Sequence, residues 1–303
     1  MCKIMMFAGL GANKQTAANR WIGAALPFLK ENDKDGVGYA AVTHAGELFG
    51  ERWVKSSEAF EVRQEFGQAD QELARRLGGA VTVSPSYNRF GAVGLDYSAI
   101  ILHTRYATCV VNLANTHPFV SDDTALIHNG VISNARDLKL KTSTCDSEAI
   151  LNSYLDNGVD QVPSSIQNTA KELQGYYACA VLARDREGVR VLDIFKDTSA
   201  NLHVCYVKAL DAYVYCTSAE ILRKVSKVSR MKISAPREIN AGHLIRLDAR
   251  TGETVSITAF NPNVRSNVLS ASFSDTISSR HMWELEEEED AKSERMINQG
   301  IVS

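Results

Sequence analysis

The stretch YYACAVLARDREGVRVLDIF, at positions 176–195, decides the fold class, because two apolar runs flank the polar residues Asp185, Arg186 and Glu187. Runs of this length joined by a short polar turn predict an antiparallel β-hairpin. The pattern recurs twice downstream, where LHVCYV (202–207) is expected to pair with AYVYCTS (212–218), and HLIRLD (243–248) with TVSITAF (254–260). Three successive hairpins favour antiparallel sheets.

Upstream, the sequence predicts further strands and a few helices. A hairpin is expected over 37–54, a buried strand over 98–104, and a strand over 124–132 that is interrupted by a turn at His128-Asn129-Gly130. Spaced apolar residues predict helices over 12–30, 56–78, 147–156 and 165–174. The strands are joined by tight turns, and the helices are bunched rather than alternating with strands. The predicted class is therefore α+β and not a doubly wound parallel sheet.

Composition and charge narrow the class of protein. Of 303 residues, 45% are hydrophobic and 23% are charged, with 33 Lys and Arg against 36 Asp and Glu. This balance is ordinary for a globular protein, and it favours neither nucleic-acid binding nor disorder. The apolar run 4–10 is too short to span a membrane and lacks a signal-peptide cleavage pattern. We therefore expect no nucleic-acid or membrane partner and a cytoplasmic location.

The C-terminal part of the chain differs from the rest. Positions 266–280 are rich in serine, and WELEEEEDAKSERM (283–296) is strongly acidic and prone to form a helix. We expect one globular domain over 1–260 and a Ser-rich and acidic tail over 261–303. Such a tail is either a solvated helix or a docking segment for a partner.

The cysteines and glycines argue against a metal or a nucleotide cofactor. The six cysteines form no CxxC pair, so no metal site is expected. Neither a GxxxxGK[ST] loop nor a GxGxxG after a strand occurs, so no cofactor is expected. Cys179, Cys205 and Cys216 lie in strand-like runs, where cysteine usually acts as a small buried hydrophobe. Cys2 differs because removal of Met1 would make it the first residue.

An N-terminal cysteine carries its own base. The α-amino group has a pKa of about 8 and the thiol one of about 8.5, so the amine can accept the thiol proton near neutral pH. It can later pass that proton to departing ammonia. A cysteine at position 2 also has a simpler explanation, because residues at this position are often small for N-terminal processing.

Three later segments supply polar groups near predicted strand and helix ends. Arg105, in HTRYAT (103–108), offers a planar fork of donors suited to a carboxylate, although a lone Arg is usually ion-paired at the surface. Asn129 and Gly130, in HNG, form either an oxyanion hole or an ordinary turn. Asp146, in CDSE (145–148), opens a predicted helix and is suited to cap it.

In chain order, the motifs MCK, DGVGYA (35–40), HTRYAT, NTHPF (115–119), HNGVISN (128–134) and CDSE resemble the class II glutamine amidotransferase domain. Members of this family are N-terminal-nucleophile (Ntn) hydrolases. The resemblance runs from Cys2 to about Asp248 and is most specific from His103 to Glu148. It implies a four-layer αββα sandwich of two antiparallel sheets, which agrees with the α+β prediction.

The resemblance also implies a role for each matching residue. Cys2 matches the nucleophile. Arg105 matches the residue that binds the α-carboxylate of glutamine, and Asp146 matches the one that holds its α-amino group. Two donors must face the oxygen of the tetrahedral intermediate, and Asn129 and Gly130 match them. The predicted catalytic residues are Cys2, Asn129 and Gly130, and the predicted substrate-binding residues are Arg105, Thr108, His128 and Asp146.

The sequence departs from the family pattern at Lys3, Tyr106 and Cys109, where many members have Gly, Trp and His. These changes are expected near the pocket, and Lys3 is more similar to the small stand-alone members. Too few residues follow 261 to form an acceptor domain. We therefore expect hydrolysis of L-glutamine to glutamate and ammonia for a separate ammonia-accepting partner enzyme. The alternatives are a free-standing hydrolase of another γ-glutamyl amide and a catalytically silent binding protein on the same fold.

Overall fold

The computed structural model describes residues 2–29, 35–56, 59–66, 97–107, 110–121, 123–138, 142–158 and 164–262. Within these ranges the strands form two sheets, in which all strand pairs are antiparallel. Sheet A has the order β12 (Arg237–Glu238), β10 (His203–Val207), β11 (Ala212–Cys216), β1 (Lys3–Phe7), β5 (Tyr97–Arg105), β2 (Gly36–Thr43), β3 (Leu48–Ser56), β4 (Ala59–Phe66). Sheet B has the order β14 (Thr254–Ala259), β13 (His243–Asp248), β9 (Arg190–Lys196), β8 (Gly175–Arg184), β7 (Thr124–Ile132), β6 (Phe119–Ser121).

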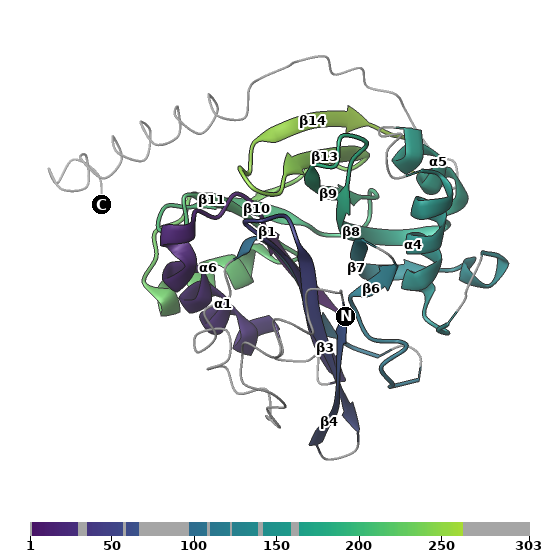
Figure 1. The fold of residues 1–303 in the computed structure, drawn as a ribbon, viewed down its shortest axis with the longest axis horizontal. Helices are drawn as coiled ribbons and strands as arrows, with labels where there is room; N and C mark the ends of the chain where they lie inside the picture. Colours follow the sequence, from purple (N-terminus) through teal and green to yellow (C-terminus); the bar gives the residue numbers. More distant parts are fainter. Residues whose placement is uncertain are drawn as a thin grey trace, which may run out of the picture. The chain divides into compact units, whose positions relative to one another are not determined.

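Helices cover the outer faces of both sheets (Figure 1). The described helices are η1 (Ala12–Lys14), α1 (Gln15–Leu29), η2 (Ala135–Asp137), α4 (Asp146–Asp156), α5 (Ser164–Glu172) and α6 (Ala219–Ser229). Helices α1 and α6 share a hydrophobic core with sheet A, and α4 and α5 share another with sheet B. A third core lies between the two sheets. The four layers confirm the predicted α+β sandwich of two antiparallel sheets.

Strand β1 shows why the apolar runs of this chain are continuous. Ile4 and Met6 belong to the core between the sheets, whereas Met5 and Phe7 face the layer of α1 and α6. Successive side chains of a strand point to opposite faces, and both faces of β1 are covered. Neither of the two alternating sets of side chains is therefore polar over residues 4–7, and this part of the strand is an unbroken hydrophobic run.

Most predicted elements are confirmed, but two are wrong. The hairpins β2–β3, β8–β9, β10–β11 and β13–β14 form as expected. The helix expected over 56–78 is wrong at 59–66, where β4 pairs with β3; positions 67–78 lie outside the described residues. Pairing with the edge of β3 outweighs the helix propensity of Glu61, Gln64 and Glu65.

The expected turn at His128-Asn129-Gly130 is also wrong, because these residues lie within the continuous strand β7 and pair with β8. Gly130 has φ of +155°, and a Cβ added to it would lie 2.1 Å from the carbonyl oxygen of Tyr176. The glycine is therefore needed for a close approach between neighbouring strands and not for chain reversal.

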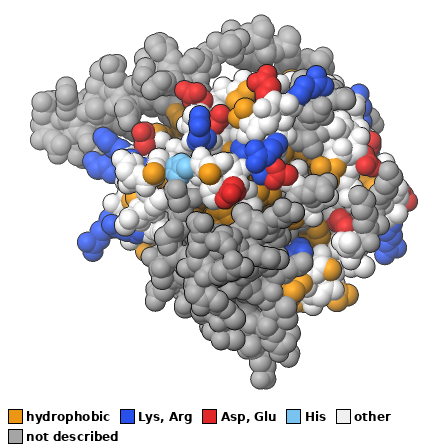
Figure 2. Space-filling view, in the orientation of Figure 1, with side chains coloured by type: hydrophobic (Ala, Val, Ile, Leu, Met, Phe, Trp, Pro, Cys, Tyr) orange, Lys and Arg blue, Asp and Glu red, His pale blue; other side chains and the backbone are white. Residues whose placement is uncertain are grey.

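Helix α6 was not among the predicted elements. Ser218 caps it by accepting a hydrogen bond from the backbone N–H of Ile221, and Arg230 ends it with φ of +56°. The predicted tail over 261–303 lies outside the described residues except for 261–262. No helix in the described ranges is long and apolar enough to be a transmembrane segment. On the face drawn in Figure 2, the described basic and acidic side chains are interspersed.

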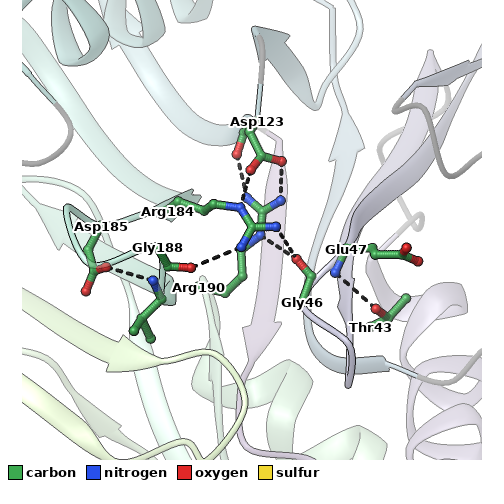
Figure 3. A network of polar contacts seen from close by, with 9 residues as sticks. Thr43, Gly46, Glu47, Asp123, Arg184, Asp185, Gly188 and Arg190 are labelled. Atoms are coloured by element: carbon green, nitrogen blue, oxygen red, sulfur yellow. Dashed lines mark hydrogen bonds and ion pairs between the residues drawn. The ribbon is translucent and has the colours of Figure 1, made fainter.

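A cluster of polar contacts ties the turns of the two sheets together (Figure 3). The Asp123 carboxylate, between β6 and β7, accepts hydrogen bonds from Arg184 and Arg190. Both arginines also donate to the carbonyl oxygen of Gly46 in the β2–β3 turn, at 2.9 and 2.8 Å. This Asp123 cluster thus joins sheet B to sheet A at the end of the strands where β2 finishes and β7 begins.

Candidate active site

A pocket of about 120 Å³ lies where β1 begins, β5 ends, β7 finishes and α4 begins. Six of the seven predicted site residues line it, namely Cys2, Arg105, His128, Asn129, Gly130 and Asp146. The seventh, Thr108, lies outside the described residues. The fold therefore brings together residues that are more than 140 positions apart in the sequence. Their individual roles remain predictions.

Cys2 reaches the pocket because of strand pairing. In the register of β1 and β5, Lys3 lies opposite Thr104, so that the next pair outward joins Cys2 and Arg105. The Cys2 side chain is partly exposed, and its sulfur contacts the backbone of Tyr106 twice. The Tyr106 N–H donates to Sγ at 3.3 Å, and the thiol donates to the Tyr106 carbonyl oxygen at 3.4 Å. These contacts fix the sulfur at the pocket wall.

Arg105 is the last residue of β5, and its side chain is buried, with 2% of the residue exposed. One guanidinium nitrogen, Nη2, donates to the carbonyl oxygen of Val110 at 3.0 Å. A buried guanidinium at a pocket wall is a strong partner for a carboxylate, because its planar donors match the two carboxylate oxygens and water does not screen it.

Three buried histidines lie beside Arg105. The rings of His103 and His117 stack with their centroids 3.8 Å apart, and His117 lies 6.5 Å from His128. Burial is the main cause that lowers the pKa of all three, and for His103 and His117 the neighbouring Arg105 cation acts in the same direction. The pKa values of His103 and His117 are lowered well below the usual value. We conclude that His103 and His117 are neutral at pH 7, and that His128 is also less readily charged than a free histidine.

Asp146 is the first residue of α4, but it does not cap the helix. The N-cap is Cys145, which makes no side-chain capping bond, so the simpler explanation of Asp146 as a cap is wrong. Instead, Asp146 Oδ2 accepts a hydrogen bond from the backbone N–H of Ile132 at 2.7 Å. A second contact joins the same elements, with 2.9 Å between His128 Nδ1 and Ser147 Oγ. Both contacts fix the start of α4 against the end of β7.

The charges that line the pocket suit a zwitterion. Among the described lining residues, Arg105 supplies a cation and Asp146 an anion. The sulfur of Cys2 and the strand segment Asn129-Gly130 line the same pocket. In the part of the chain that the structure describes, no three His, Cys, Asp or Glu side chains are placed to hold a metal ion. The arrangement can hold a small α-amino acid and present it to a thiol.

Several lining residues were not predicted. His117, Val131, Ser147 and Tyr176 also face the pocket. His117 lies in the quoted NTHPF motif and Ser147 in CDSE, so the motifs held a signal for both. Val131 lies in the quoted HNGVISN motif. Tyr176 carries no such signal, because only the pairing of β7 with β8 brings it beside Val131.

The three departures from the family pattern have different positions. Lys3 does not line the pocket; its Nζ donates to the carbonyl oxygen of Leu29, the last residue of α1, at 3.4 Å. The expectation that Lys3 lies at the pocket is therefore wrong. Its ammonium group lies at the C-terminus of α1, where a cation is favourable. Tyr106 does line the pocket. Cys109 lies outside the described residues.

No protein-family model matches the chain. Its sequence is similar to isomerizing glutamine–fructose-6-phosphate aminotransferases. One from Xanthomonas campestris pv. campestris is 38% identical over 94 residues, covering 27% of this chain and 15% of that protein. One from Chlamydia abortus is 33% identical over 177 residues, covering 54% of this chain and 25% of that protein. The chain thus spans a quarter or less of the length of these two relatives.

Solved structures extend the likeness to nearly the whole described fold. Glutamine phosphoribosylpyrophosphate amidotransferase from B. subtilis matches with a TM-score of 0.58 and 17% identity, over 87% of this chain and 50% of that chain. A structure described as the allosteric regulatory enzyme of purine biosynthesis matches with a TM-score of 0.60 and 18% identity, over the same shares. The chain therefore has the fold of these two solved structures, and part of it resembles in sequence the glutamine–fructose-6-phosphate aminotransferases.

Proposed function

We propose that this protein hydrolyses the amide of L-glutamine through a thioester on Cys2 and releases glutamate and ammonia. This proposal rests on one observation, which is that Cys2, Arg105 and Asp146 line the same pocket. It combines a nucleophile with one cation and one anion for the α-carboxylate and α-amino groups of an amino acid. The names of the similar proteins, which are glutamine-dependent aminotransferases and amidotransferases, agree with this substrate.

The reaction follows from the groups in the pocket once Met1 has been removed. The α-amino group of Cys2 accepts the thiol proton, and the sulfur attacks the amide carbon of glutamine. The oxygen of that amide becomes negatively charged, and the Asn129 side-chain amide and the Gly130 N–H stabilise it. The carbon–nitrogen bond then breaks, and the α-ammonium group passes its proton to the leaving ammonia. Water hydrolyses the thioester, which yields glutamate and regenerates the thiol.

The fate of the ammonia is part of the proposal. The chain matches one half of each of the two solved chains and a quarter or less of the two curated relatives described above. We propose that the reaction partner of this domain is a separate ammonia-accepting enzyme, and that the protein works in the cytoplasm.

One observation favours a second candidate substrate, a γ-glutamyl amide with an apolar group on its amide nitrogen. Tyr106 and Val131 both line the pocket, yet 50% of Tyr106 and 38% of Val131 are exposed. Large apolar side chains exposed beside a pocket often contact a ligand or a partner. They suit a bulky apolar leaving amine, whereas ammonia would not contact them.

A direct comparison of substrates tests the proposal. Glutamate release is measured from L-glutamine and from an N-butyl γ-glutamyl amide, with protein shown by mass to have lost Met1. Faster turnover of glutamine supports the ammonia-producing function, and faster turnover of the substituted amide supports the second candidate. If neither compound yields glutamate, alone or with acceptor enzymes added, the hydrolase assignment is wrong and the catalytically silent alternative holds.

A further inference from the structure

Asp35 holds the chain segment that contacts the Cys2 sulfur. It immediately precedes β2, and its backbone N–H donates to the carbonyl oxygen of Arg105 at 3.2 Å. Its side-chain oxygen Oδ2 accepts a hydrogen bond from the N–H of Ala107 at 2.7 Å. These two bonds lie on either side of Tyr106 in the sequence. They therefore fix the peptide groups before and after the residue whose backbone contacts Cys2.

The segment needs such a contact because it lies beyond the sheet. Strand β5 ends at Arg105, so the ladder with β2 does not extend to Tyr106 and Ala107. Half of Tyr106 is exposed, so burial of its side chain cannot fix its backbone well. A charge-assisted hydrogen bond from a backbone N–H to a carboxylate is stronger and more strictly oriented than one between neutral groups.

The contact between Tyr106 and Cys2 bears on the reactivity of the sulfur. A hydrogen bond donated to a sulfur favours the thiolate over the thiol, because the charged form is the stronger acceptor. The Tyr106 N–H makes this contact, at 3.3 Å from Sγ. This N–H belongs to the peptide group between Arg105 and Tyr106, and a small rotation of that group, as when the next peptide group at Ala107 is released, would lengthen the contact.

We propose that Asp35 is a positioning residue for the segment 105–107: its backbone N–H holds the peptide group whose N–H, that of Tyr106, points at the Cys2 sulfur, and its carboxylate holds the next peptide group at Ala107, so that the segment keeps this orientation and the thiol stays reactive. The effect on turnover rests on the proposed function, but the effect on the thiol does not. Asp35 does not act as an acid or base toward the substrate, and it is absent from the pocket lining.

The geometry of the contact and the charge of the carboxylate have opposite effects on the thiolate. The negative charge of Asp35 disfavours a nearby thiolate, whereas its contact with Ala107 favours it. Asp35→Asn removes the charge and keeps an acceptor oxygen. Asp35→Glu keeps the charge and displaces the acceptor by one methylene, and Asp35→Ala removes both. Asp35→Ala and Asp35→Glu each break the contact with Ala107, so if one variant fails to fold, the other still tests the contact.

The test is the rate at which iodoacetamide alkylates Cys2 in the full-length protein, followed as a function of pH by mass spectrometry of the N-terminal peptide. We expect Asp35→Ala and Asp35→Glu to raise the pH midpoint by about one unit, which is about a tenfold slower reaction at pH 7. Asp35→Asn should react within about twofold of the wild type, or faster. The thiols of Cys205 and Cys216 serve as internal controls for the fold, because burial raises their pKa to about 12 and about 11.

Two results would overturn the inference. If Asp35→Ala and Asp35→Asn both react faster than the wild type, the carboxylate acts through its charge alone. If all three variants react like the wild type, Asp35 does not position the sulfur. Glutamine turnover is measured in parallel, and a lower kcat at unchanged KM is expected for Asp35→Ala. A wild-type protein that is alkylated rapidly but releases no glutamate would contradict the proposed function and leave the role of Asp35 intact.

Discussion

Acidification should destabilise this protein steeply between pH 6.5 and pH 5, because His103, His117 and His128 are buried. Burial lowers the pKa of each in the folded state, whereas in the unfolded chain each has the ordinary value of about 6.5. Below pH 6.5 the unfolded state therefore binds more protons than the folded state. The free energy of unfolding must then decrease as the pH falls. The stabilisation is fully present above the unfolded pKa and is lost below it.

The magnitude follows from the number of buried rings. A histidine that stays neutral in the fold costs about 1.4 kcal/mol of stability at pH 5.5, relative to high pH. His103 and His117, whose pKa values are lowered well below the usual value, together cost about 3 kcal/mol at that pH, and the slope that they cause approaches about 3 kcal/mol per pH unit below it. His128 acts in the same direction. A typical domain has a free energy of unfolding of about 5–15 kcal/mol, so this loss is a large part of the total.

Urea titration at a series of pH values measures the free energy of unfolding and hence the slope. His117→Gln removes one of the two rings that cause most of the slope and should lower the slope by about one third to one half. The control is Ile22→Val in α1, on the other side of sheet A, which should cost about 1 kcal/mol at every pH without changing the slope. A slope of zero between pH 6.5 and pH 5 in the wild type would refute the conclusion that these histidines are neutral.

Three further substitutions have defined outcomes. Arg105→Lys keeps the charge but loses the planar fork, so we expect kcat/KM for glutamine to fall by about 10- to 100-fold, chiefly through KM; an unchanged KM contradicts the carboxylate assignment. Gly130→Ala places a Cβ 2.1 Å from the Tyr176 carbonyl oxygen and should cost about 2 kcal/mol or more, measured by urea unfolding; unchanged stability contradicts the close approach. Asp123→Ala removes the ion pair of the buried Arg190, at a half-exposed carboxylate, and should cost about 1–2 kcal/mol while leaving kcat unchanged, because the cluster lies away from the pocket; a large loss of kcat contradicts that separation.

The sheets were predictable because their strands are long, apolar and joined by short polar turns. The hairpin over 176–195 forms as β8 and β9 with the expected turn. The range 59–66 was not predictable from its residues, because local propensity favours a helix and only the edge of β3 makes it a strand. Helix α6 could have been predicted from the sequence, since the capping residue Ser218 precedes apolar residues at helical spacing, namely Ile221, Leu222 and Val225.

The site was predictable to the extent that its residues lie in motifs. Cys2, Arg105 and Asp146 were named from their motifs, and the fold places all three at one pocket. The role of Asp35 was not foreseen, although DGVGYA had been singled out, because its contact with Ala107 spans 72 positions. The neutral state of His117 also required the structure, since burial and its neighbours determine it. Long-range contacts decide such properties, and sequence spacing does not reveal them.

The central claim is that the sulfur of Cys2 attacks the amide carbon of glutamine, and trapping the acyl-enzyme tests it most directly. Protein that has lost Met1 is mixed with L-glutamine, quenched in acid within milliseconds to seconds, digested and analysed by mass spectrometry. The account predicts one γ-glutamyl group on the N-terminal peptide of the wild type, and neither this adduct nor glutamate release in Cys2→Ala. Glutamate release that persists in Cys2→Ala, or an adduct on a different residue, would contradict it.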